Sequence, residues 1–79
     1  MSVMYVIITC DVGFEKSVIA ELKTINFVKE VIRIMSEYDI LVKLESDNPD
    51  DLKNIIPSKI RKIPNIRSTL TLTVVESQE

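Results

Sequence analysis

Two apolar stripes, 38 positions apart, constrain how this chain can fold more than any other feature of the sequence. The first stripe comprises Phe14, Val18, Leu22 and Ile25, and the second comprises Leu52, Ile56, Ile60 and Ile63. In both, apolar residues recur at intervals of four, four and three, which is the spacing of one face of an amphipathic helix. The sequence therefore predicts a helix over residues 14–25 and an equivalent helix 38 positions later.

Each predicted helix lies between two runs of residues that favour β-strands. These runs are Val3–Cys10, Val28–Met35, Ile40–Ser46 and Ile66–Val75. The chain thus reads strand, helix, strand, twice over, which predicts an α+β, ferredoxin-like βαββαβ fold. In that fold, one antiparallel four-stranded sheet carries both helices on one face. The almost continuously apolar first run is typical of a central strand.

The second helix has a clear beginning and an interruption. Asn48 is a favoured N-cap, and Pro49 suits the first helical position. Pro57 lies inside the helix, where it cannot donate a hydrogen bond to the carbonyl of Lys53. We therefore expect a kink at Pro57 or a division of the helix into two pieces, as a tolerated bend or as a functional hinge.

The composition excludes several classes of protein. The 79 residues suffice for a single domain, residues 1–79, and they include no histidine and one cysteine, Cys10. Histidine-dependent catalysis, imidazole metal sites and disulfides within the chain are therefore excluded. A net charge of −2 does not suit a free-standing nucleic-acid binder. Because no apolar run could span a membrane, we expect a cytoplasmic protein. Because the chain has no histidine and no evident pair of catalytic carboxylates, we expect it to be non-enzymatic, without a cofactor or metal.

Two helices can cover only one face of a four-stranded sheet, and the sequence predicts an apolar surface on the other face. Strict alternation in the last strand places Thr71, Thr73 and Val75 on this open face, with Leu41 of the third strand. In the second strand, alternation groups Val28, Glu30, Ile32 and Ile34 on one side. A half-apolar, β-branched sheet face usually packs against another, so we expect a face-to-face homodimer, a dimeric α/β barrel.

Two polar segments could bind a small molecule. The turn Ser36-Glu37-Tyr38-Asp39 offers N–H groups, carboxylates and an aromatic ring, and the last strand offers the hydroxyl groups of Ser68, Thr69 and Thr71. Together such groups can bind a zwitterion: the N–H and hydroxyl groups donate hydrogen bonds to its carboxylate, and Asp39 pairs with its ammonium group. Each of these residues also has a purely structural explanation. Asp39 is a common turn residue, Tyr38 can pack on the hairpin, and threonines favour strands. Spacing alone does not decide between these interpretations.

The order of these segments resembles a known family. The run from Ile34 to Lys43 is similar to the hairpin of the effector-binding domain of the Lrp/AsnC regulators, the RAM (regulation of amino acid metabolism) domain. That hairpin typically reads apolar, Gly, acidic or polar, aromatic, Asp and then an apolar strand. The run from Ile63 to Thr71 resembles the family's approach to a strand with two alternating threonines. The resemblance covers about Val3–Glu76.

The resemblance implies a domain that dimerises through its sheets, assembles further, as far as octamers, and binds amino acids between dimers. In this chain it implies that the ligand is bordered by Ser36, Glu37, Tyr38, Asp39, Ser68, Thr69 and Thr71. Of these residues, Asp39 is the best match for the one that would bind the α-amino group of the ligand.

This chain departs from the family pattern in four ways. Ser36 and Asn65 replace glycines, and Asn26-Phe27 replaces a Pro-Gly pair. No helix-turn-helix precedes Val3, which indicates a stand-alone form of the domain.

Three functions are compatible with these features. The preferred one is a non-enzymatic sensor that binds an amino acid between dimers and modulates full-length Lrp/AsnC regulators. Its own assembly would be a homodimer or a higher oligomer, up to an octamer. The second is a purely structural assembly module that has lost the ligand, for which Ser36 is the main support. The third is a small enzyme built on a dimeric ferredoxin-like barrel, with Asp11 or Glu30 in its cavity. Direct DNA binding by basic residues near the second helix end is disfavoured, because they also balance the helix dipole.

Overall fold

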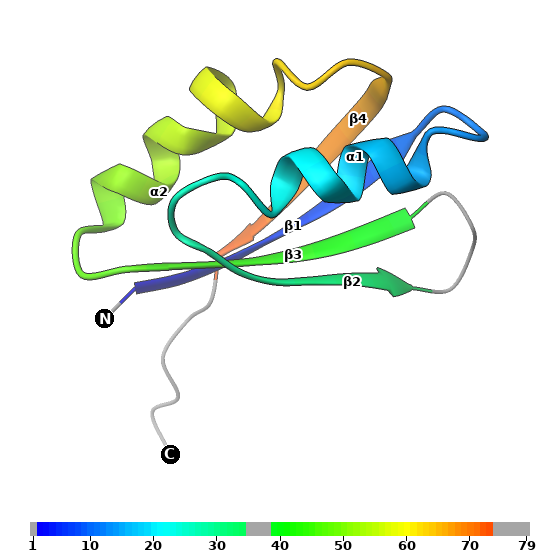
Figure 1. The fold of residues 1–79 in the computed structure, drawn as a ribbon. Coiled ribbons are helices and arrows are strands. Elements are labelled where there is room, and N and C mark those ends of the chain that lie inside the picture. Colours follow the sequence, from blue (N-terminus) through cyan, green and yellow to red (C-terminus); the bar gives the residue numbers. More distant parts are fainter. Residues whose placement is uncertain (1, 35–38, 74–79) are drawn as a thin grey trace.

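A computed structural model describes residues 2–34 and 39–73. Its elements are β1 (Ser2–Cys10), α1 (Glu15–Leu22), β2 (Val28–Ile34), β3 (Asp39–Ser46), α2 (Pro49–Ile55), the π-helical turn η1 (Ile56–Ile60) and β4 (Ile66–Thr73). The strands are all paired antiparallel in the order β2-β3-β1-β4. Figure 1 shows both helices on one side of this sheet. The predicted ferredoxin-like fold is confirmed, with the first strand in its centre.

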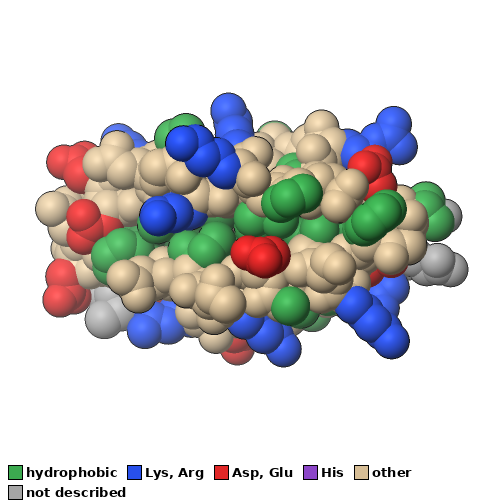
Figure 2. Space-filling model, turned by 45° about the horizontal axis from the view of Figure 1, so that its top comes forward, with side chains coloured by type: hydrophobic (Ala, Val, Ile, Leu, Met, Phe, Trp, Pro, Cys, Tyr) green, Lys and Arg blue, Asp and Glu red, His purple; other side chains and the backbone are tan. Residues whose placement is uncertain are grey.

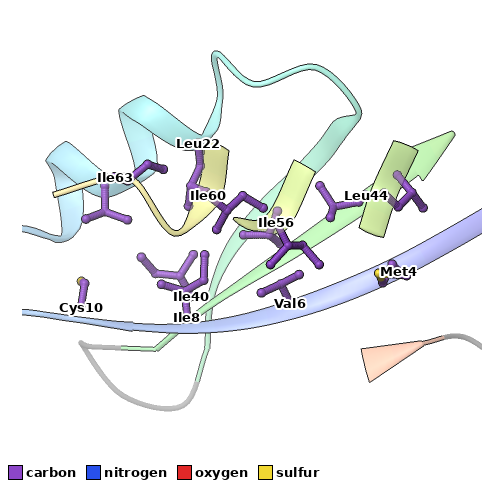
Figure 3. Packing of buried hydrophobic residues seen from close by; sticks show 13 residues of the cluster. Met4, Val6, Ile8, Cys10, Leu22, Ile40, Leu44, Ile56, Ile60 and Ile63 are labelled. Carbon is purple, nitrogen blue, oxygen red and sulfur yellow. The ribbon is translucent and has the colours of Figure 1, made fainter. Parts of the chain in front are cut away.

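The core lies between the sheet and the helices. The strands contribute Met4, Val6, Ile8, Cys10, Ile40, Val42 and Leu44, and the helical side contributes Val18, Leu22, Leu52, Ile56, Ile60 and Ile63. The strand residues alternate along β1 and β3 because successive side chains of a strand point to opposite faces. Figure 3 shows these side chains pointing toward the helical layer. Both apolar stripes thus pack in or against the core, with the exception of Phe14.

The first helix is shorter than its apolar stripe predicts. α1 ends at Leu22, and the N–H of Ile25 donates to the Leu22 carbonyl at 3.1 Å in the turn that follows. Phe14 precedes the helix at the N-cap position and is 43% exposed. The prediction that Phe14 packs with Val18 in the core is therefore wrong. Apolar spacing continues through the cap, so it does not locate the first helical residue.

A bulge in β2 changes which of its residues share a face. Val28 lies opposite Leu44, whereas Glu30 lies opposite Lys43, so the register skips Lys29. An extra residue of this kind shifts the alternation by one position. Val28 consequently packs against the core from the helix side. The prediction that Val28 shares a face with Glu30 is wrong.

A second bulge occurs at the start of β4. Ile66 lies opposite Cys10 and Ser68 lies opposite Thr9, so the register skips Arg67. Ile66 thereby joins the helix side, where it packs against the core.

The bulge reverses the predicted faces for the rest of β4. Thr71 and Thr73 lie opposite buried residues of β1, on the helix side of the sheet. The open face of β4 instead carries Ser68, Leu70 and Leu72. The prediction that Thr71 and Thr73 face away from the helices is therefore wrong, and Val75 lies outside the described residues.

Pro57 divides the second helix into two pieces, as predicted. The helix begins with Asn48, whose side-chain Oδ1 accepts the N–H of Asp50 at 2.9 Å. After α2 the chain continues as η1, in which the N–H of Arg61 donates to the Ile56 carbonyl, five residues earlier, at 2.9 Å. This wider turn accommodates a residue that has no N–H to donate.

Candidate functional site

Two of the predicted ligand residues, Asp39 and Ser68, lie at the end of the sheet where β3 and β4 begin. Asp39 is the first residue of β3, and its backbone lies opposite Thr9 of β1. Ser36, Glu37 and Tyr38 lie outside the described residues, as does the side chain of Asp39.

Ser68 lies in the same row of the sheet as Asp39. Thr9 of the central strand pairs with Asp39 on one side and with Ser68 on the other. The backbones of Asp39 and Ser68 are therefore two strand spacings apart, about 10 Å. That separation is suitable for residues that flank one small ligand from two sides.

Thr69 and Thr71 lie on the helix side of β4, opposite Ile8 and Val6. The structure thus separates these two threonines from Ser68, which lies on the open face. The three predicted ligand residues of β4 therefore occupy both faces of this edge strand.

Arg61, one of the basic residues near the end of the second helix, contacts one of these threonines. The Arg61 Nε donates to the Thr69 Oγ1 at 3.2 Å, which links the end of η1 to β4. No spacing pattern indicates a contact between residues eight positions apart in different elements. Nearby, Arg67 Nε lies 3.8 Å from Asp11 Oδ1, and both side chains are well exposed, so solvent screens this pair.

The open face carries an apolar row across all four strands. Ile32 pairs with Leu41, Leu41 with Ile7, and Ile7 with Leu70. Ile32 is 45% exposed and Leu70 is 58% exposed, and Leu72 on the same face is 43% exposed. Contiguous apolar side chains on an uncovered face are typical of a surface that packs against a partner. An apolar open face was predicted, but on β4 leucines form it rather than threonines.

An ion pair lies on this open face. The Lys43 Nζ is 3.1 Å from the Glu45 Oε2, two residues further along β3. The hydrogen bond to Glu45, together with the negative charge of its carboxylate, raises the pKa of Lys43 above its ordinary value of 10.5. The ammonium group is therefore held in its charged form next to the apolar row.

The described residues include a buried thiol but no cluster of metal-ligating side chains. Cys10 is 1% exposed, and burial raises the pKa of its thiol, which disfavours the reactive thiolate. Residues 2–34 and 39–73 contain no group of three or more His, Cys, Asp or Glu side chains that could hold a metal ion. Over the same ranges, no helix is long and apolar enough to cross a membrane.

Charges of both signs cover the helix side of the molecule. Figure 2 shows acidic and basic side chains interspersed there, with hydrophobic side chains visible between them. A mixed surface of this kind differs from the basic stripe that nucleic-acid binders present.

A model of the family described as "Lrp/AsnC ligand binding domain" matches residues 3–78. The chain is similar to the crystal structure of FFRP-DM1, with a TM-score of 0.85 and 35% identity over 95% of this chain and 100% of that one. It is also similar to the hypothetical protein PHS023 from Pyrococcus horikoshii, with a TM-score of 0.84 and 34% identity over 98% and 93% of the two chains. For AsnC from E. coli, the TM-score is 0.80 and the identity 27%, over 95% of this chain and 52% of that one.

Part of an enzyme is similar as well. The chain is 43% identical over 70 residues to a homocitrate synthase of Saccharolobus islandicus, which covers 87% of this chain but 15% of the synthase. A homocitrate synthase of Sulfurisphaera tokodaii is 41% identical over 63 residues, 80% of this chain and 14% of the synthase. The chain therefore spans about one seventh of the synthases that it matches. Since the family match extends over residues 3–78 and the fold agrees with that of AsnC, the chain belongs to the Lrp/AsnC ligand binding domain family.

Proposed function

We propose that this chain is a non-enzymatic regulatory domain that forms oligomers and binds an amino acid at the interface between dimers. The family match over residues 3–78 is the observation that carries this proposal. The solved structures similar to this chain include transcriptional regulators of that family, such as AsnC.

The open sheet face is the proposed dimer surface. Two copies packed face to face would remove the row of Ile32, Leu41, Ile7 and Leu70 from water. Burial of apolar surface contributes roughly 25 cal/mol per Å², so a row across the full width of the sheet supplies a substantial driving force. A two-fold axis through such a face yields a closed dimer.

The proposed ligand set combines the β2–β3 turn with the start of β4. It consists of Ser36, Glu37, Tyr38, Asp39, Ser68, Thr69 and Thr71. Asp39 would pair with the α-ammonium group, while N–H and hydroxyl donors bind the carboxylate. Because Thr69 and Thr71 lie on the opposite face of β4 from Ser68, they would contact a ligand between dimers from a different side than Ser68 does.

The same contacts would allow mixed assemblies with full-length Lrp/AsnC regulators. A domain that shares the sheet face and the turn can replace one partner in such an oligomer. The amino acid would then control the regulator by favouring or opposing assembly.

Light scattering on a sizing column, with each of the twenty amino acids in turn, tests this proposal. We expect a dimer that shifts to a larger species with at least one amino acid, and isothermal titration should detect the same ligand. Asp39→Asn should abolish the shift, whereas Asp47→Asn, an exposed position outside the proposed set, should leave it intact. Silence with all twenty amino acids would leave only the assembly module, and a monomer would contradict both.

The similarity to homocitrate synthases favours a second candidate function, that of a regulatory module acting on a biosynthetic enzyme. Identity is 43% with the Saccharolobus synthase and 41% with the Sulfurisphaera synthase, compared with 27% for AsnC. The chain would then bind a synthase and change its turnover when the amino acid is present. Mixing the chain with the Saccharolobus synthase, and measuring both the mass of the mixture and its turnover, distinguishes this candidate from action on a transcription regulator.

A further inference from the structure

A groove with an apolar floor runs along the helix side of the edge strand β4. It is an open depression of about 360 Å³ between β4 and the second helix. Met4 and Ile56, each 5% exposed, form part of its floor, and Pro57 lines it beside them. Figure 1 shows β4 at the edge of the sheet, next to β1. Because its lining residues lie on the helix side of the sheet, the groove is separate from the open face that the proposed dimer uses.

The rim of this groove is basic and rich in hydroxyl groups. Lys53 and Arg61 line it from the helical side, and Thr71 and Thr73 line it from β4. Neither Lys53 nor Arg61 forms an ion pair with any residue that the structure describes. Two cations without an ion-pair partner among residues 2–34 and 39–73, beside two hydroxyl groups, provide donors and positive charge for one anionic group.

The break at Pro57 sets the position of Arg61. The π-helical turn ends at Arg61, whose N–H donates to the Ile56 carbonyl at 2.9 Å. The Arg61 Nε then donates to the Thr69 Oγ1 at 3.2 Å. This bond holds the guanidinium group beside Thr69, the residue that precedes Thr71 on the helix side of β4. It uses only Nε, so the two terminal nitrogens can take a planar, two-oxygen acceptor such as a carboxylate.

We propose that this groove binds the carboxylate of a small aliphatic acid. Arg61 and Lys53 hold the carboxylate, with hydroxyl donors from Thr71 and Thr73. The carbon chain lies on Met4, Ile56 and Pro57. This site takes an acid without requiring an ammonium group, and it shares only Thr71 with the proposed amino-acid set.

Titration with hexanoate, followed by NMR, tests the site. Hexanoate should shift the methyl resonances of Met4 and Ile56 and the amide resonances of Thr71 and Thr73. Hexan-1-ol, which lacks the charge, and inorganic phosphate, which lacks the chain, should each bind about tenfold more weakly. Either comparator binding as tightly as hexanoate would overturn the proposal, since the groove would then be a plain apolar or plain anion site.

Charge-matched variants separate a specific site from general attraction. Arg61→Gln should weaken hexanoate binding about tenfold, and Arg61→Lys should restore part of the loss. Lys59→Gln removes the same charge from the same helical turn, at a residue that lines a different depression, and should change nothing. Equal effects of Arg61→Gln and Lys59→Gln would contradict the proposal.

A last variant tells the two ligand sites apart. Asp39→Asn should leave hexanoate binding unchanged, whether or not it abolishes binding of an amino acid. Hexanoate shifts confined to the residues around the β2–β3 turn would overturn the groove site and leave the amino-acid proposal standing.

Discussion

Phe27 and Asn65 lie 38 positions apart and adopt the same left-handed backbone conformation, with φ of 76° and 74°. Both precede an edge strand, and both carbonyls accept an N–H from the neighbouring central strand or its end. Phe27 accepts from Glu45 at 2.9 Å, and Asn65 accepts from Asp11 at 2.8 Å. The repeat seen in the apolar stripes thus extends to the backbone of the two loops.

The bulges follow the same repeat. The register skips Lys29 in β2 and Arg67 in β4, in each case two positions after the left-handed residue. Phe27 and Asn65 stand where the family resemblance leads one to expect glycine, the residue that adopts positive φ without strain. The left-handed conformation is therefore retained in both loops without glycine.

Substitution of Asn65 tests the cost of this conformation. Asn65→Ala should destabilise the fold by about 1 kcal/mol, because a β-carbon without a polar side chain is disfavoured at positive φ. Asn65→Gly should be close to neutral, since relief of strain is offset by the greater freedom of the unfolded chain. Urea unfolding measures both. Asn26→Ala, an exposed position in the other loop, is the control, and an equal loss there would refute the explanation.

The cap of the second helix can be tested in the same way. Asn48→Ala removes the side-chain acceptor for the Asp50 N–H and should cost about 1 kcal/mol of stability. Asn54→Ala makes the same substitution inside α2, where alanine is the better helix former, and should stabilise slightly. Thermal unfolding followed by circular dichroism compares the two, and the cap assignment fails if both changes have the same sign.

The dimer surface can be tested with a single charge. Leu41→Lys places two ammonium groups within the proposed two-fold interface and should weaken dimerisation by about 100-fold or more. Asn54→Lys adds the same charge on α2, away from the open face, and should have no effect. Sedimentation at several concentrations gives the dissociation constants. A Leu41→Lys protein that remains as tight a dimer as the parent would assign assembly to another surface.

The Lys43–Glu45 pair predicts a specific alkaline titration. Because the pKa of Lys43 is raised in the folded state, the pair stabilises the fold fully below the unfolded-state pKa of about 10.4. That contribution is lost as the pH rises through the folded-state value. NMR titration of the Lys43 ε-methylene should therefore show a midpoint above 10.5, which falls in Glu45→Gln. Glu21→Gln, on α1, should leave the midpoint in place, and an unchanged midpoint in Glu45→Gln would show that the pair does not form in solution.

The element order, the central strand, the Asn48 cap and the break at Pro57 were all predictable from the sequence. Each depends on local physics, namely apolar spacing, capping chemistry and the missing N–H of proline. The family was recognisable for a related reason, because its two motifs are short and local.

The faces of the edge strands were not predictable, because a skipped residue shifts every later side chain to the opposite face. The register at Lys29 and Arg67 depends on hydrogen bonds between strands, and at Arg67 the two strands lie at opposite ends of the chain. For the same reason, Thr69 and Thr71 proved to lie on the helix side, with Arg61 bonded to Thr69. The sequence by itself determined which elements form and in what order. Only the tertiary structure decided which side chains meet, because that depends on the pairing of strands rather than on spacing along them.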